Sequence, residues 1–393
     1  MLQLIPISLS IAVAILTLTA IFSVTPQMFK SIQCPPIESD TEVPAYSILN
    51  SATLEGTDDP QAVFLYANPD THALYLAEGG TPAIHILDTD TLAQTAQFDI
   101  TGFPNGLFFN KLNNKIYVID DANTEVQVYD GTTFESIANV TLLTNAVQSD
   151  PDLGTNLMYI AESNGGTNSY QVLDMSTDTI IGEGNATGTI FGIAHDDLTS
   201  QTYLVAVSDD TTNIYNSTNQ QTGTKSTVSG KWVDVDEAGD FFYVLAPQAQ
   251  KLYVFDRLTT NLVESVDLFL NDVLTTFMVV EPNEHLLFFS DDGGRSMQVY
   301  STVTNEKVAG PANLGAVFYN PAFDPQREIG YVYDFDTNSI VSFNLFDIPA
   351  GDPGAIAWEE SCVNLRTQTT FVPVLLTLAI VVVALFVVTK LFN

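Results

Sequence analysis

The chain has 393 residues, 46% of them hydrophobic and 15% charged, a composition that can build a large folded core. Its 47 Asp and Glu against 12 Lys and Arg give a formal net charge of -35. A surface this acidic repels phosphate groups, so nucleic-acid binding is excluded. The scarcity of Lys fits a protein bathed in high salt, and it fits an acidic secreted glycoprotein equally well.

An uncharged apolar segment, Leu4–Val24, lies near the start of the chain. Its length of about 21 residues is enough to span a bilayer and exceeds that of an ordinary signal-peptide core. We therefore predict a signal anchor over residues 1–29, with a cleaved signal peptide as the alternative. Residues 30–44 are polar and rich in Pro, and we expect them to form a stem.

From residue 45 to residue 352 the sequence repeats one pattern of short alternating strands. The first strand of each repeat is expected to start near Ala62, Gly106, Ala146, Ile190, Lys231, Thr276 and Gly315, a period of about 40 to 45 residues. The second strands are predicted at Ala73–Glu78, Lys115–Asp120, Leu157–Glu162, Thr202–Val207, Phe241–Ala246, Leu286–Asp291 and Gly330–Phe335. The third strands are predicted at Ala83–Asp88, Glu125–Asp130, Ser169–Asp174, Thr212–Ser217, Lys251–Asp256, Ser296–Ser301 and Ser339–Asn344. Four-stranded units with this period are typical of propeller blades, and seven copies predict seven blades.

Two repeats carry a resemblance to a known family. The second contains GLFFNKLNNKIYVIDDANTEVQVYDGTTFESIANV and the fifth contains WVDVDEAGDFFYVLAPQAQKLYVFDRLTTNLVESV. Both resemble the YVTN family of propeller repeats found in archaeal and bacterial surface proteins. The resemblance extends over about 300 residues, implies a surface-exposed propeller and carries no catalytic signature.

The seventh repeat has no fourth strand of its own, because the chain continues into IPAGDPGAIAWEE after Asp347. We expect Ala45–Gly56 to supply that strand and to close the ring, which removes the last open sheet edge. In such a closure both ends of the propeller leave on one face. The loops between second and third strands then lie on the opposite face, which would point away from a membrane.

The C-terminal part is predicted to contain a stem over residues 353–370 and a transmembrane helix over residues 371–390. The apolar run from Phe371 to Val388 is followed by Lys390, a basic stop on the inner side, and a buried helix of a soluble domain is the alternative. The predicted fold class is therefore all-β, a seven-bladed β-propeller with flanking N- and C-terminal transmembrane helices. We expect the propeller to be extracytoplasmic, on a cell surface or envelope membrane.

An extracytoplasmic location would allow a disulfide and N-linked glycosylation. Cys34 and Cys362 each lie roughly ten residues from an apolar segment, and we predict a disulfide between them, with two free thiols as the alternative. Asn139, Asn185 and Asn216 begin Asn-x-Ser/Thr triplets and are predicted glycosylation sites.

Carboxylates follow the second strand in six of the seven repeats. They are Glu78, Asp120, Asp121, Glu162, Asp209, Asp210, Asp291, Asp292, Asp334 and Asp336. On a ring they are expected to form a crown around the mouth of the central channel. The candidate metal ligands, with calcium as the ion, are Asp120, Asp121, Asp209, Asp210, Asp291 and Asp292. The crown could instead bind a basic surface of a partner protein. The alternative to any binding role is that Asp is common in these loops because it favours turns.

Catalytic motifs are sparse. His72, His85, His195 and His285 are spread over four repeats without ligand spacing, and no nucleophile elbow, phosphate loop or dinucleotide fingerprint is present. The segment DVDEAGD from Asp234 resembles a calcium loop superficially but lies where every other repeat has a strand turn. We therefore predict no catalytic residue and no cofactor other than calcium, and we do not expect an enzyme.

The sequence favours a membrane-anchored, extracytoplasmic propeller that acts as a binding, adhesion or assembly module of a cell surface or virion envelope. Its expected partners are the membrane and a protein or glycan on the membrane-distal face. Two alternatives remain open. One is an exported propeller enzyme, a lyase or cofactor-dependent oxidoreductase, with its site at the channel mouth, and the other is an accessory subunit of a membrane complex.

Overall fold

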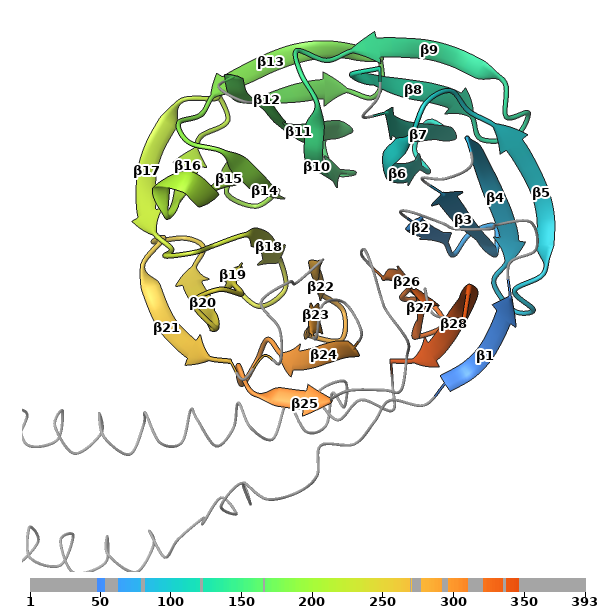
Figure 1. Ribbon diagram of the computed structural model, residues 1–393. Coiled ribbons are helices and arrows are strands. Elements are labelled where there is room, and N and C mark those ends of the chain that lie inside the picture. The colour runs from blue at the N-terminus through green and yellow to red at the C-terminus, as the bar shows by residue number, and fades with distance from the viewer. Residues whose placement is uncertain are drawn as a thin grey trace, which may run out of the picture. The chain divides into compact units, whose positions relative to one another are not determined.

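Seven four-stranded antiparallel sheets surround a common centre and form the ring shown in Figure 1. The computed structural model describes residues 48–53, 63–78, 82–120, 123–164, 167–268, 270, 277–291, 296–309, 321–334 and 337–345. Each sheet is one blade, and the blades are numbered 1 to 7 from the one that begins with β2. The predicted seven-bladed propeller is confirmed.

In blades 1 to 6 the chain runs from the innermost strand outward, and in blade 7 the first three strands follow the same order (Figure 1). The innermost strands are β2 (Val63–Asn68), β6 (Pro104–Asn110), β10 (Ala146–Asp152), β14 (Ile190–Asp196), β18 (Trp232–Asp236), β22 (Met278–Glu281) and β26 (Ala322–Asp324). The second strands are β3 (Ala73–Glu78), β7 (Lys115–Asp120), β11 (Leu157–Asn164), β15 (Gln201–Ala206), β19 (Phe241–Ala246), β23 (Leu286–Asp291) and β27 (Ile329–Asp334). The third strands are β4 (Ala83–Asp88), β8 (Glu125–Asp130), β12 (Thr167–Asp174), β16 (Thr211–Tyr215), β20 (Lys251–Asp256), β24 (Ser296–Ser301) and β28 (Ser339–Asn344). The outer strands are β5 (Gln94–Asp99), β9 (Ser136–Thr141), β13 (Thr179–Asn185), β17 (Gln221–Ser226), β21 (Leu262–Asp267), β25 (Lys307–Ala309) and β1 (Ile48–Thr53).

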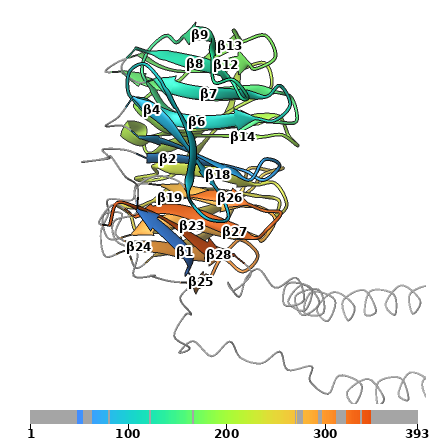
Figure 2. The same cartoon turned by 90° about the vertical axis from the view of Figure 1, so that its right-hand side faces the viewer.

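The outer strand of blade 7 comes from the N-terminal side of the chain, as predicted. β1 pairs antiparallel with β28, from Ile48 opposite Phe343 to Thr53 opposite Ser339. Figure 2 shows the two strands side by side. Because strands from the two ends of the propeller share one sheet, the ring is closed by backbone hydrogen bonds, and β28 has no unpaired outer edge.

The second and third strands lie within two residues of their predicted bounds. Larger differences from the prediction occur in blades 7 and 4. β26 begins at Ala322, seven residues after the expected start near Gly315. It follows Pro321, which has no backbone N–H to give to a strand ladder. In blade 4 a short 3-10 helix, η1 (Val207–Asp209), follows the second strand instead of a simple turn.

None of the described residues forms a helix that is long and apolar enough to cross a membrane. The predicted membrane segments at residues 1–29 and 371–390, the two stems, Cys34 and Cys362 all lie outside the described residues.

The core consists of seven apolar clusters, and each cluster joins two neighbouring blades. The middle strands of a blade are covered on both faces, which is why they read as nearly continuous apolar runs such as KIYVID. Between blades 4 and 5, for example, the rings of Tyr203 and Phe242 stack with centroids 4.1 Å apart. Outer strands such as β13 alternate between exposed and half-buried residues.

A repeated tyrosine connects successive blades. At the third position of the second strand, its buried hydroxyl donates a hydrogen bond to a backbone carbonyl just after the third strand of the next blade. These bonds are Tyr117 to Met175 (2.7 Å), Tyr203 to Arg257 (3.5 Å), Tyr243 to Thr302 (3.0 Å) and Tyr331 to Thr89 (3.2 Å). The tyrosine of the repeat therefore links one blade to the next while its ring fills the core between them.

Carboxylates also connect the innermost strands. Asp150 Oδ2 in β10 accepts a hydrogen bond from the backbone N–H of His195 in β14 (2.6 Å). Asp234 Oδ2 in β18 accepts one from Val280 in β22 (2.7 Å). Burial raises the pKa of Asp234 to about 7, with a further rise from the charges of nearby acidic residues. These bonds fix the positions of the inner strands relative to one another.

We expect Tyr243→Phe to lower the free energy of unfolding by about 1–2 kcal/mol, because the buried carbonyl of Thr302 loses its donor. The matched control is Tyr253→Phe in β20, since within the described residues the Tyr253 hydroxyl makes no hydrogen bond. Chemical denaturation of the two variants and the parent protein measures the effect. Equal losses in both variants would contradict the proposed role of the repeated tyrosine.

We expect Asp234→Asn to stabilise the protein at pH 8 and to leave its stability nearly unchanged at pH 4. The folded protein holds a proton on Asp234 up to about pH 7, whereas the unfolded chain releases it near the ordinary value of 3.8. The parent protein therefore loses stability as the pH rises through this window, and Asn does not titrate. The difference at pH 8 should be on the order of 2 kcal/mol, because Asp234 is only half-buried and solvent screens part of the effect. Asp99→Asn, at an exposed position of β5, removes the same charge as a control. A difference that does not depend on pH would refute the assignment.

Candidate functional site

The turn between the first and second strand has the same construction in all seven blades. The last residue of the inner strand is a buried side chain whose oxygen accepts a backbone N–H from the turn. These cap residues are Asn68, Asn110, Asp152, Asp196, Asp236, Glu281 and Asp324. Four positions later the chain adopts a positive φ, at His72, Asn114, Asn156, Ser200, Asp240, His285 and Glu328. The repeated turn places the residue after each cap at an equivalent point around the ring.

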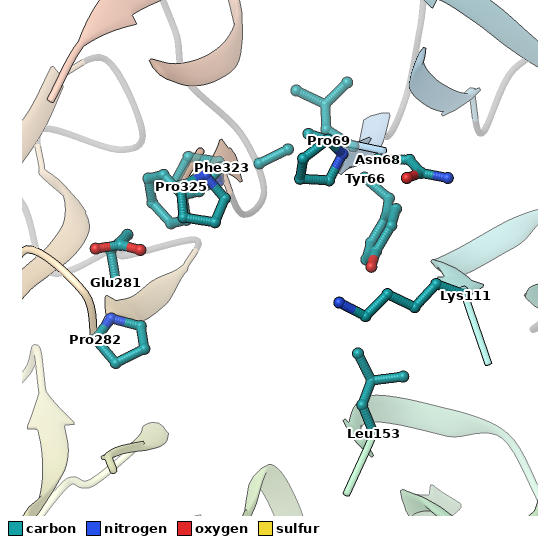
Figure 3. Close-up of a pocket in the computed structure, with 13 residues that line it drawn as sticks. Tyr66, Asn68, Pro69, Lys111, Leu153, Glu281, Pro282, Phe323 and Pro325 are labelled. Carbon is teal, nitrogen blue, oxygen red and sulfur yellow. The ribbon is translucent and has the colours of Figure 1, made fainter. Parts of the chain in front are cut away.

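We call those seven following residues the rim. They are Pro69, Lys111, Leu153, Asp197, Glu237, Pro282 and Pro325. Five of the seven line a cavity of about 360 Å³ together with the apolar side chains of Tyr66 and Phe323. Figure 3 shows Tyr66 and Lys111 projecting into the cavity from one side and Glu281 from the opposite side. The mouth on this face is thus an apolar cavity with a cation on one wall and a carboxylate on another.

Blades 4 and 5 give the rim a different character, because their rim residues are the exposed acids Asp197 and Glu237. Partial desolvation by the surrounding protein raises the pKa of Glu237, and the charge of Asp196 raises it further. The buried Arg257 offsets part of this charge, since its Nη1 lies 3.5 Å from Asp196 and its Nη2 lies 3.3 Å from Asp240. The acidic side of the mouth therefore faces the apolar cavity across the ring centre.

A smaller cluster lies within the acidic side. Ligand-type atoms of Asp152, His195 and Asp197 all lie within 4.8 Å of one another. Partial desolvation by the surrounding protein raises the pKa of Asp197 to about 7, and the neighbouring Asp152 carboxyl adds to that rise. The pKa of Asp152 itself is lowered, since hydrogen bonds from Thr155 outweigh the effect of burial. The two carboxyl groups therefore share one proton near neutral pH.

The His195 imidazole is held in a fixed orientation. It is 6% exposed, stacks on Tyr159 with centroids 3.8 Å apart, and its Nδ1 lies 3.0 Å from Thr202 Oγ1. Burial lowers the pKa of His195 to about 4, although the charges of the neighbouring carboxylates oppose this shift. The ring is neutral at pH 7 and can act as a hydrogen-bond acceptor or a metal ligand.

The residues of the predicted crown have other roles. Asp120 is buried and accepts hydrogen bonds from Phe103 N, Asn123 Nδ2 and Gln127 Nε2. Glu162 is also buried and accepts one from Thr144 N, while Glu78 and Asp334 are buried at the equivalent positions. All four carboxylates are buried, and the hydrogen bonds of Asp120 and Glu162 hold loops within their own blades. Calcium binding by the predicted residues stays a prediction.

Asp209 and Asp210 are the other crown residues whose side chains the structure describes. Asp209 Oδ1 accepts a hydrogen bond from Ser208, and Asp210 Oδ1 accepts one from Ser229 N. Asp121, Asp292 and Asp336, and the side chain of Asp291, lie outside the described residues. Within the described part of the chain, Asp152, His195 and Asp197 form the one group of three or more metal-ligand side chains.

Sequence reasoning missed this cluster because its members come from different repeats. Asp152 and His195 are 43 residues apart and meet only when adjacent blades pack. One sequence feature could have indicated the cluster: Asp, Asn or Glu recurs at the end of every first strand. DVDEAGD is a strand turn as predicted, with Asp236 Oδ1 accepting from Ala238 N and Gly239 N.

The remaining predicted residues are placed as follows. His85 lies in β4 with its Nδ1 3.0 Å from Gln94 Oε1, and His72 and His285 each precede a second strand. Asn139 and Asn185 are exposed on outer strands, and Asn216 is half-buried after β16. Glycosylation at these three positions stays a prediction.

No family model matches the sequence, and neither does any curated protein. Among solved structures, the chain is similar to Kuenenia stuttgartiensis Hydrazine Synthase, with a TM-score of 0.63 and 12% sequence identity. The match covers 75% of this chain and 99% of the other. At this identity the likeness shows a shared fold alone, the seven-bladed β-propeller.

Proposed function

We propose that the protein is a binding module whose recognition site is the mouth of the ring on the face of the rim. One observation carries this proposal: an apolar cavity and two exposed acidic side chains occur together on the same rim. Cavities with a few convergent polar groups are the usual form of a recognition site. The closed ring gives this surface a fixed shape, so little conformational entropy is lost on binding.

The chemistry of the mouth indicates the partner. Apolar walls from Tyr66, Phe323 and the rim prolines suit an apolar side chain, while Asp197 and Glu237 suit a Lys or Arg beside it. We infer a polypeptide segment that carries an apolar residue next to a basic one. Lys111, which projects into the cavity from one wall, then fixes the direction of the bound segment.

Location and membership of a repeat family are further parts of the proposal. The YVTN resemblance and the apolar segments near both ends support an extracytoplasmic propeller anchored in a cell-surface or envelope membrane. In that setting the protein serves adhesion or assembly. It can equally act as an accessory subunit of a membrane complex, held there by the same segments.

A second function, an exported enzyme, is favoured by one specific observation. His195, Asp152 and Asp197 are titratable groups with shifted pKa values at the mouth, an arrangement that is also common in catalytic sites. A reaction catalysed at the mouth would require these side chains and would not require a polypeptide partner.

The proposal is tested by placing a photo-crosslinking amino acid at position 111 of the full-length protein in its native membranes. We expect irradiation to join it to one polypeptide, whose crosslinked peptide holds a Lys or Arg next to an apolar residue. The crosslink should be at least about tenfold weaker when Asp197 and Glu237 are both replaced by Lys, because the acidic side then repels the basic residue.

The control carries the same photo-crosslinking group at Leu262, which is exposed on β21 far out on blade 5. Identical crosslinking patterns from positions 111 and 262 would refute recognition at the mouth. An unchanged crosslink after the two charge reversals would refute the basic partner.

A further inference from the structure

We propose that Asp152, His195 and Asp197 form a binding site for a first-row divalent transition-metal ion. The site belongs to blades 3 and 4, and it does not depend on the partner proposed above. Its three candidate ligands are two carboxylates and one imidazole.

The three side chains converge from separate elements. Asp152 ends β10, His195 lies in β14, and Asp197 follows β14 in the turn. A Cβ built on Gly154 would lie 3.1 Å from Asp152 Oδ1 and 3.4 Å from Asp197 Oδ2, so the two carboxylates flank the same small space. A side chain larger than hydrogen at position 154 would intrude on it.

The spacing suits one ion. Ligands of a first-row ion lie about 2.0–2.2 Å from it, so two of them are at most about 4.4 Å apart. The observed limit of 4.8 Å requires only a small movement of the exposed Asp197 side chain. Asp152 and His195 are buried and hydrogen-bonded, so their side chains are held in place on either side of the site.

The buried imidazole of His195 distinguishes this cluster from an ordinary group of surface acids. Its ring is nine-tenths buried, and Thr202 engages Nδ1. Within the described residues no hydrogen bond to Nε2 is seen, so this nitrogen is open to a ligand. Its backbone is fixed as well, since Asp150 accepts the His195 N–H. Metal-bound imidazoles are usually held in this way through their second nitrogen.

The ligand types restrict the metal. Calcium and magnesium prefer oxygen ligands alone, whereas imidazole together with carboxylate is typical of Mn²⁺, Fe²⁺, Co²⁺ and Zn²⁺. Three protein ligands leave coordination positions open to water or to a bound partner group. The exposed Glu237 on the adjacent rim position adds negative charge, which favours a cation here.

The test uses the full-length protein in detergent, freed of metal with a chelator and titrated with Mn²⁺. The electron paramagnetic resonance signal of free Mn²⁺ gives the stoichiometry and affinity, and we expect one ion per chain. Asp197→Asn should weaken binding at least about tenfold, since even second-shell changes at metal sites cost this much. Its side chain is exposed, so this variant should fold normally.

Two controls make the result specific. Asp99→Asn removes one exposed acid far from the cluster and should leave Mn²⁺ affinity unchanged. Protein labelled with ¹⁵N-histidine should show nitrogen coupling to bound Mn²⁺ by pulsed resonance, and Asp197→Asn should abolish that signal. No stoichiometric binding, no histidine coupling, equal effects of the two variants, or displacement by an equal concentration of Ca²⁺ would each overturn the proposal.

Discussion

The pairing of β1 with β28 is the constraint on which the arrangement of the other strands depends. Each apolar cluster lies between two blades, so a blade at an open end of the series would expose one of its faces to water. The pairing makes blade 7 from both ends of the propeller, and the cluster that contains Leu74 and Tyr331 then joins blade 7 to blade 1. With no free end in the ring, the inner strands stay at fixed positions around the centre, and a site built from several blades keeps its geometry.

The same side chains shape both the fold and the mouth. A cap residue closes the turn after every inner strand, and burial of its oxygen is tolerated because turn N–H groups bond to it. Five of the seven caps are acidic, so the turns also concentrate negative charge near the ring centre. Asp152 illustrates the overlap, since it caps its own turn and faces Asp197 of the next blade. The caps therefore hold the turns, and the rim residues that follow them carry the side chains at the mouth.

The two faces of the ring differ in what their carboxylates do. On the face of the loops between second and third strands, Asp120 and Glu162 are enclosed by backbone and side-chain donors. On the opposite face, Asp197 and Glu237 remain exposed to solvent. Counting acids in loops could not separate these cases, because an Asp that accepts several hydrogen bonds inside a loop looks the same in the sequence as one that faces water.

The sequence by itself determined the blade number, the strand order and the closing strand. Strand alternation, runs such as KIYVID and the missing fourth strand of the last repeat are local features that each fix one element. Only the tertiary structure decided which polar residues meet. Asp152, His195 and Asp197 are brought together by the packing of blade 3 against blade 4, and the rim becomes a single surface only when seven turns surround one centre. Contacts between repeats depend on the lateral packing of sheets, which a one-dimensional period does not specify.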